Sequence, residues 1–232
     1  FGYNPLELQE LALAALLPDI GLLQIPAPII QRSANPSSPL SPHDKQILRS
    51  HPRLGILALE RQGGFGTRVL QMIGEHHMRL DDSGYPQGTK GEFTSERSRI
   101  LMIADYYDEL ITGFGGASPL APHQALQRIF RESQDGAFDQ VILERFIKLI
   151  GIYPVHSRVQ LNTKERAVVT ELNPSALHRP VVTITHTTTG NETPTPLVID
   201  LSDQVNVTPE RAIDKVLDSP EHIHPASSSQ AA

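Results

Sequence analysis

The first two thirds of the chain show the spacing of apolar residues that is typical of amphipathic helices. Apolar positions recur every three or four residues, so they fall on one side of each helix. Asn4 and Ser41 each stand before a proline, as N-cap residues often do, and Glu7 lies three residues after the first of these caps. The pattern predicts helices at 6–17, 41–61 with a break near His51, 67–80, 97–112, 121–133 and 138–150.

After residue 154 the period changes from helical to alternating. Short runs of β-branched and polar residues are separated by Gly, Asn and Pro, which is typical of strands joined by turns. We expect three or four strands, at 159–161, 166–172, 179–187 and 197–201, and a short helix at 210–217. The sequence thus predicts a mainly α protein: a bundle of about six helices at 1–154, a small β-rich unit at 155–218 and a flexible tail at 219–232.

Composition and charge exclude some classes of function. The 232 residues carry a net charge of −6, so no broad basic surface for nucleic acid or for an anionic membrane is expected. Cysteine is absent, which excludes disulfides and thiolate metal sites. The most apolar stretch, 11–30, is interrupted by prolines and predicts a buried helix followed by a loop rather than a membrane span. We see no signal peptide and expect a cytoplasmic protein, of which this chain is a fragment.

Two short motifs invite comparison with metal sites. His76 and His77 are adjacent near the end of the predicted helix 67–80, where side chains project about 100° apart and both imidazoles can reach one cavity. The pair can equally be two structural histidines that are satisfied by hydrogen bonds at a helix end. The other motif, His43-Asp44, follows a helix start, where a carboxylate suits the helix dipole, and we do not expect it to bind metal.

Three further residues could join a site at the histidine pair. Asp105 borders the apolar side of helix 97–112, where an unpaired carboxylate is costly to bury, so it indicates a cation or a hydrogen-bond partner. The neighbouring Asp108 and Glu109 are expected on the solvated face of that helix. His51 lies at a helix break, from which it can turn toward another element, and Asp19 follows a buried helix.

These motifs, in their order along the chain, resemble those of the HD-GYP family. The stretch 76–86 reads His-His-Met-Arg-Leu-Asp-Asp-Ser-Gly-Tyr-Pro, and the family signature is a histidine pair followed by Arg-x-Asp-x-x-Gly-Tyr-Pro. Upstream, Pro-Asp-Ile-Gly-Leu at 18–22 corresponds to the family's His-Asp-x-Gly-Lys, and His-Pro follows at 51–52. Downstream, 104–108 corresponds to the family's Ala-Asp-x-Tyr-Asp. The resemblance covers roughly 4–154, and the β-rich remainder is similar to an extension found behind some HD-GYP domains.

The resemblance implies an HD-type helical bundle and metal-assisted hydrolysis of cyclic di-GMP. Family members hold two or three ions, often iron or manganese, and the aspartate of the His-Asp pair bridges them. The implied metal ligands are Asp19, His51, His76, His77 and Asp105. The implied ligand-binding residues are Arg79, Asp81, Gly84, Tyr85 and Pro86. Their loop is expected to line a pocket for cyclic di-GMP or a related cyclic dinucleotide, or to present a surface to a signalling protein.

Departures from the family pattern indicate a degenerate site. Pro18 replaces the histidine of the His-Asp pair; it offers no metal ligand and disturbs a helix at a cost of about 3 kcal/mol. Either Asp19 is misaimed as a result, or the helix ends one residue earlier and Asp19 still reaches the cavity. Leu22 replaces the family's phosphate-binding lysine, and the stretch 106–127 contains no Lys or Arg where the family supplies two cations. The family's upstream helix, with a further Glu and His, would precede Phe1.

Three functional hypotheses follow from these departures. We favour a catalytically impaired domain that senses cyclic di-GMP or binds a partner, because the missing cations are needed to stabilise a transferring phosphoryl group. The alternative is an active phosphodiesterase that works with one or two ions. The third is a structural remnant without metal.

Overall fold

The computed structural model describes residues 1–35, 37–86, 91–205 and 208–217. The chain divides into two compact units: the first comprises 1–119 and 127–146, and the second comprises 120–126 and the chain from 147 onward. The first unit is helical, and the strands of the described residues lie in the second. None of the described helices is both long enough and apolar enough to cross a lipid bilayer. The tail predicted at 219–232 lies outside the described residues.

The predicted mainly α fold is confirmed, and each helix predicted for the bundle at 1–154 is present in whole or in part. The helical segments are α1 (Pro5–Leu16), the 3₁₀ helix η1 (Pro18–Gln24), α2 (Ala27–Ser33), α3 (Pro42–Leu48), α4 (His51–Gln62), α5 (Thr67–Glu75), η2 (Gly91–Phe93), α6 (Glu96–Thr112), η3 (Phe114–Gly116), α7 (Pro122–Gln134) and α8 (Gln140–Ile150). The predicted start of α1 is a capping box, in which the side chains of Asn4 and Glu7 each accept a hydrogen bond of 3.0 Å from the other residue's backbone amide.

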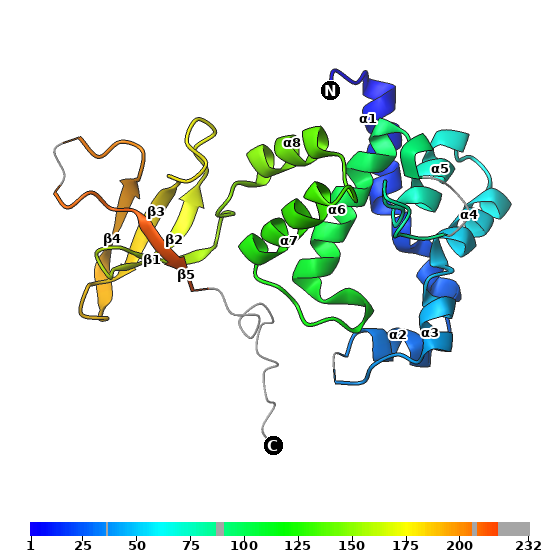
Figure 1. Ribbon diagram of the computed structural model, residues 1–232, viewed down its shortest axis with the longest axis horizontal. Helices are drawn as coiled ribbons and strands as arrows, with labels where there is room; N and C mark the ends of the chain where they lie inside the picture. Colours follow the sequence, from blue (N-terminus) through cyan, green and yellow to red (C-terminus); the bar gives the residue numbers. More distant parts are fainter. Residues whose placement is uncertain (36, 87–90, 206–207, 218–232) are drawn as a thin grey trace. The chain divides into compact units, whose positions relative to one another are not determined.

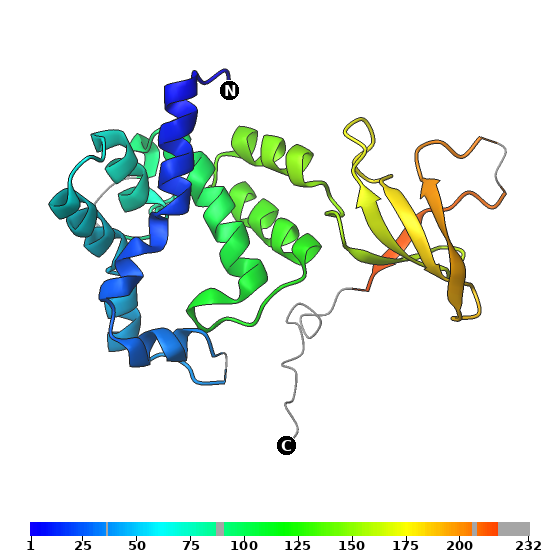
Figure 2. The same cartoon turned by 180° about the vertical axis from the view of Figure 1, so that it is seen from behind.

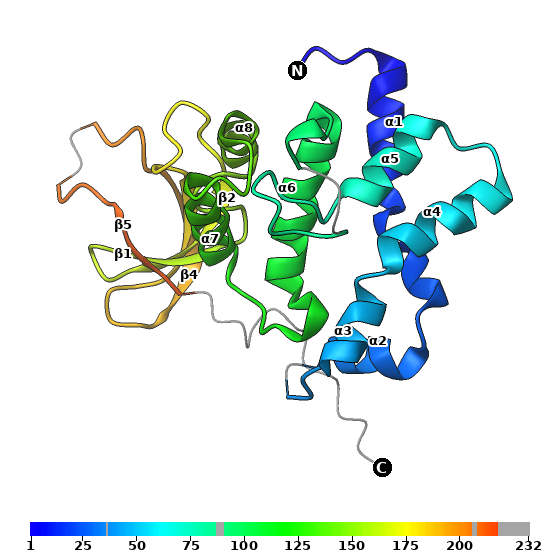
Figure 3. The ribbon, with the colours of Figure 1, turned by 45° about the vertical axis from the view of Figure 1, so that its right-hand side comes forward.

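The core of the first unit forms where α1, α5 and α6 pack together (Figure 1). Ala14, Ile73 and Leu101, one from each of these helices, are among its buried residues. Helices α2 and α3 lie side by side (Figure 3) and contribute Ile29 and Leu48 to a second apolar cluster. Because α4 contacts both α5 and η1, the packing brings the ends of these three elements together.

Local departures from the predicted helices shape this meeting point. The loop expected after α1 is instead η1 and α2. Helix η1 can pack closely on α4 because Gly21 has no side chain; a Cβ at this position would lie only 2.0 Å from the carbonyl oxygen of His51. The helix expected at 41–61 is two helices, and α4 begins at His51. Helix α5 ends at Glu75 rather than at residue 80, because the Met78 amide turns back to the Glu75 carbonyl, 2.8 Å away.

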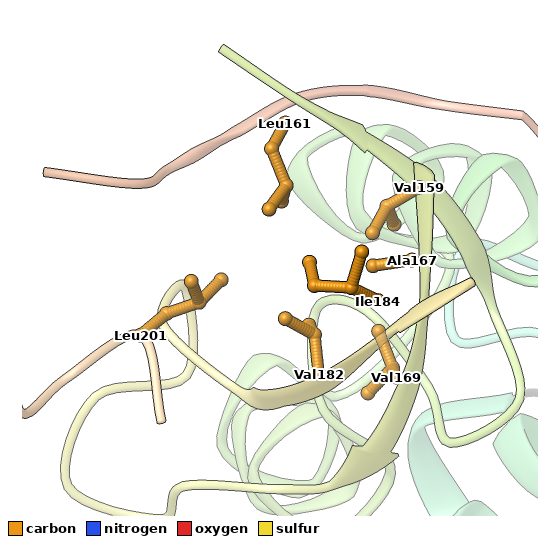
Figure 4. Close-up of a cluster of buried hydrophobic side chains, with 7 residues drawn as sticks. All are labelled: Val159, Leu161, Ala167, Val169, Val182, Ile184 and Leu201. Carbon is orange, nitrogen blue, oxygen red and sulfur yellow. The ribbon is translucent and has the colours of Figure 1, made fainter. Parts of the chain in front are cut away.

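The second unit contains a five-stranded antiparallel sheet in the order β4-β3-β2-β1-β5 (Figure 1, Figure 2). Its strands are β1 (Arg158–Leu161), β2 (Arg166–Glu171), β3 (Val181–His186), β4 (Glu192–Asp200) and β5 (Ile213–Val216). Alternate side chains of β1 to β3 point toward one another and form an apolar core (Figure 4). The core residues are Val159, Leu161, Ala167, Val169, Val182, Ile184 and Leu201.

The prediction of a short helix at 210–217 is wrong. Residues 213–216 form β5, which pairs with β1 and raises the strand number above the three or four expected. The edge of β1 offers unpaired backbone groups, and satisfying them outweighs a weak local preference for helix.

Candidate metal and ligand site

Three buried histidines meet where helix α4 begins and helix α5 ends. His51 is the first residue of α4, and His76 and His77 follow the last residue of α5. All three residues are at most 3% exposed. Nε2 of His51 lies 3.1 Å from Nε2 of His76 and 3.1 Å from Nε2 of His77. The tertiary structure therefore joins two stretches that the sequence presented as separate candidates.

Asp19 reaches the same cluster from η1. Its Oδ1 lies 3.2 Å from Nε2 of His51. Helix α1 has ended at Leu16, and Pro18 is buried as the first residue of η1. Of the two geometries that the sequence left open, the structure has the one in which the helix ends early and Asp19 still reaches the cavity. Asp19 and the three histidines place one ligand atom each within 4.8 Å of one another.

The hydrogen bonds of the histidine rings indicate that this cluster fits a cation. Nδ1 of His51 lies 2.8 Å from the carbonyl oxygen of Leu48, and Nδ1 of His76 lies 2.6 Å from that of Ile73. A carbonyl oxygen only accepts, so each Nδ1 donates the ring proton, and the two facing Nε2 atoms carry lone pairs. Burial, reinforced by His51, lowers the pKa of His76 to about 4, so this ring is neutral near pH 7.

Facing lone pairs repel each other unless a cation lies between them. Imidazoles whose second nitrogen is fixed by a backbone carbonyl are the usual form of histidine metal ligands. Two such nitrogens, together with Nε2 of His77 and the carboxylate of Asp19, make a donor set suited to a divalent transition metal. The residues that are present therefore fit a metal ion.

Two carboxylates of α6 form a second group around His77. Nδ1 of His77 lies 3.5 Å from Oδ2 of Asp105 and 3.9 Å from Oε2 of Glu109. Within the described part of the chain, this Asp105 oxygen is buried and takes part in no hydrogen bond. Burial, together with the charges of Glu109 and Asp19, raises the pKa of Asp105 to about 8, and burial raises the pKa of Glu109 to about 7. Such carboxylates favour a nearby cation, so this group fits a metal ion as well.

Glu109 is a candidate ligand that the sequence interpretation missed. The solvated face expected for Asp108 and Glu109 is correct for Asp108, which is exposed, but wrong for Glu109, whose side chain is only 24% exposed. The sequence did contain a signal. Glu109 follows Asp105 by four positions, which places both carboxylates on the same side of a helix.

A cavity of about 490 Å³ adjoins the cluster and is bordered by the loop after α5. The ring of Tyr85 stacks on His77 with their centroids 4.5 Å apart, and the Tyr85 amide donates a 3.0 Å hydrogen bond to the His77 carbonyl oxygen. Gly84 allows this approach, because a Cβ there would lie 2.3 Å from the same oxygen. Asp81 does not line this cavity. Its carboxylate accepts hydrogen bonds from the amide and hydroxyl of Ser83 and shapes the loop instead.

The stretch 106–127 carries no cation, but other parts of the bundle supply cations to the cavity. The cations that line the cavity are Lys45, Arg49, Arg79 and Arg128. They come from α3, the residue after α3, the loop after α5 and α7, all outside the stretch 106–127 that lacks cations. The guanidinium group of Arg79 lies over the rings of Tyr106 and Phe138, 4.5 and 4.6 Å from their centroids, and Arg128 pairs with Glu132 at 2.9 Å.

At position 22, the chain has a leucine where the family has a lysine, so this position supplies no cation to the cavity. The Leu22 side chain packs against the apolar cluster that contains Leu40 and Leu48, and these two residues also line the cavity. The wall of the cavity is therefore apolar on that side. Pro86, the last residue of the predicted ligand-binding set, is exposed and lines a neighbouring cavity of about 580 Å³, which also involves Tyr85.

Two parts of the chain match known protein families. Residues 2–142 match the family described as "HD domain", and residues 158–223 match one described as "KOW domain associated with HD domain". The helical bundle and the β-rich unit are thus recognised separately, in the order in which they occur here.

The curated relatives are cyclic dinucleotide phosphodiesterases. A cyclic di-GMP phosphodiesterase of Pseudomonas aeruginosa is 30% identical over 176 residues, which cover 76% of this chain and 41% of the relative. A probable cyclic di-GMP phosphodiesterase of Vibrio cholerae is 32% identical over 141 residues, covering 58% of this chain and 31% of the relative. The chain therefore spans about two fifths or less of these relatives' length. In fold, it resembles the solved structure of an HDG"Y"P protein from Bdellovibrio bacteriovorus, with a TM-score of 0.51, 23% identity, and coverage of 63% of this chain and 45% of the other.

Proposed function

We propose that this chain, which belongs to the HD domain family and within it to the HD-GYP group, is a metal-dependent cyclic di-GMP-binding domain whose hydrolytic activity is impaired. The observation that carries the proposal is the convergence of Asp19, His51, His76 and His77 on one point beside a cavity lined with cations. The relatives named as cyclic di-GMP phosphodiesterases support the choice of ligand.

Each group of residues has a part in this function. Asp19 and the three histidines would hold the ion, iron or manganese, and Asp105 and Glu109 would supply further carboxylate ligands beside His77. A bound ion of this kind polarises a phosphoryl oxygen and lowers the pKa of a bound water. The cations of the cavity bind phosphate oxygens, and Tyr85 covers His77 and limits the access of water.

Impaired hydrolysis follows from two positions. Pro18 supplies no nitrogen ligand where the family has a histidine, so the metal site would have one ligand fewer than in the family. Leu22 presents an apolar side chain where the family has a lysine, and losing one such group lowers the rate about a hundredfold. Binding needs fewer of these contacts than turnover does, because it does not depend on stabilising the charge that develops in the transition state.

The test combines metal content, binding and turnover on the same preparation. We expect purified protein to carry iron or manganese by elemental analysis and to bind cyclic di-GMP by calorimetry. We expect no linear dinucleotide or GMP above the level of a His76→Ala, His77→Ala control. Protein that holds no metal and binds no nucleotide refutes the proposal and leaves the structural remnant.

The alternative function is an active phosphodiesterase. Glu109 favours it, since it adds a carboxylate that the family motif did not predict, and so do the cations that line the cavity from other elements. Rapid product formation with added manganese, abolished in the double histidine variant, would establish this alternative. If hydrolysis is impaired as proposed, the Pro18→His, Leu22→Lys double variant should bind more metal and show a higher turnover rate than wild type.

A further inference from the structure

Three cations form a row along α3 and α4 beside the candidate metal cluster. Lys45, Arg49 and Arg53 follow one another at intervals of four residues, and all three are exposed. Lys45 and Arg49 line the cavity of about 490 Å³ that contains His77. All three line the neighbouring cavity of about 580 Å³. We call these residues the cationic row.

The cationic row lacks the carboxylate partners that several other cations of the bundle have. Arg99, for example, lies 3.1 Å from Asp139, and Arg128 pairs with Glu132. Within the described residues, no member of the row makes an ion pair or a side-chain hydrogen bond. Three unpaired cations in succession are notable in a chain of net charge −6, because they concentrate positive potential at one place.

The neighbouring cavity has a chemical character of its own. The three cations are its charged lining residues, and none of its lining residues is acidic. The aliphatic rings of Pro42, Pro52 and Pro86 contribute an apolar wall. An apolar wall beside cations suits a ligand that combines a planar base with a phosphate.

Tyr85 and Arg49 connect the two cavities. Both residues line both cavities, and the guanidinium group of Arg49 lies over the Tyr85 ring, 5.3 Å from its centroid. The same Tyr85 ring stacks on His77. One ligand of two similar halves can therefore occupy both cavities across this pair, with one half near the metal cluster.

We propose that the second cavity, with Arg53 and the prolines, binds the second nucleotide half of a cyclic dinucleotide, and that the cationic row holds its phosphodiester groups. This inference rests on the proposed function, because the first half lies at the metal cluster. It assigns to Arg53 the selectivity for a dinucleotide over a mononucleotide, since Arg53 lines the second cavity but not the first.

The experiment compares cyclic di-GMP with GMP by calorimetry, in the presence of manganese, on the full chain. We expect Arg53→Ala to weaken cyclic di-GMP binding about tenfold, the effect of one lost charge-assisted hydrogen bond, and to leave GMP binding unchanged. Arg49→Ala should weaken both ligands, because Arg49 lines both cavities. Arg61→Ala is the matched control: it removes an exposed arginine of α4 that lines neither cavity.

The outcomes separate the two proposals. If wild type binds cyclic di-GMP and Arg53→Ala behaves like Arg61→Ala, the second-cavity inference fails while the proposed function stands. If Arg53→Ala weakens the binding of cyclic di-GMP and GMP equally, the inference is also refuted, because the loss then reflects only the lower positive charge near the metal cluster. If metal-loaded wild type binds no cyclic di-GMP, the proposed function itself is refuted, and this inference with it.

Discussion

Replacing His77 with alanine gives the most direct test of the metal centre. His77 is the residue shared by the two donor groups: its Nε2 faces His51, and its Nδ1 faces Asp105 and Glu109. Its removal therefore weakens the binding of any ion held by either group. No other residue of the described chain belongs to both groups.

The magnitude follows from the linkage between binding and folding. An ion that binds only the folded state, at about 100 times its dissociation constant, stabilises that state by about 2.7 kcal/mol. For a domain of this size, this corresponds to a rise in Tm of about 5–10 °C. If losing one ligand weakens affinity about a hundredfold, the same metal concentration contributes only about 0.4 kcal/mol, and the rise falls to about 1 °C.

The assay is thermal unfolding followed by circular dichroism at 222 nm, which reports on the helices, with and without manganese. Wild type should show the metal-dependent rise, and His77→Ala should lose most of it. His43→Ala is the matched control, because His43 is an exposed histidine of α3 outside both donor groups. A full metal-dependent rise in His77→Ala, or its loss in His43→Ala, would show that the buried histidines do not form the ion site.

Three further predictions follow from particular contacts. Glu109→Gln should lower the metal content measured by elemental analysis, whereas Asp108→Asn, at an exposed position one residue away, should not; equal metal content in both variants contradicts a role for Glu109. Gly84→Ala should destabilise the protein by about 1–3 kcal/mol and weaken nucleotide binding, because its Cβ would overlap the His77 carbonyl oxygen. Gly66→Ala is the control: nothing lies within 4 Å of a Cβ there, so this variant should fold and bind normally. Denaturant unfolding measures the stability of both variants, and calorimetry measures their nucleotide binding. In the β-rich unit, the hydrogen bond from Arg211 lowers the pKa of Glu165 below 4.5, so its stabilising effect is present above that pH and is lost as pH falls through the lowered value. Hydrogen exchange in β1 and β2 should accordingly be faster in Glu165→Gln than in wild type at pH 7 but similar at low pH, and a pH-independent difference would contradict this.

Much of the bundle could be predicted from the sequence because helix signals are local. The apolar spacing of 97–112 places α6 within one residue of its observed start, and the cap at Asn4 sets the start of α1. The same locality explains the errors. Nothing near 210–217 indicates that β1, about fifty residues earlier, offers it an edge to pair with. The end of α5 depends on a turn that lets His76 and His77 face His51, which is a tertiary contact.

The sequence by itself determined which chemistry this protein could host, since imidazoles and carboxylates in a set order are readable without a fold. It also showed that Pro18 and Leu22 cannot act as a metal ligand and a cation, because these are properties of the side chains alone. Only the tertiary structure decided that Asp19 still reaches His51, that Glu109 faces His77, and that cations of α3 and α7 line the cavity. These outcomes depend on how separate helices pack against one another, and side chains that meet from distant parts of the chain leave no local pattern.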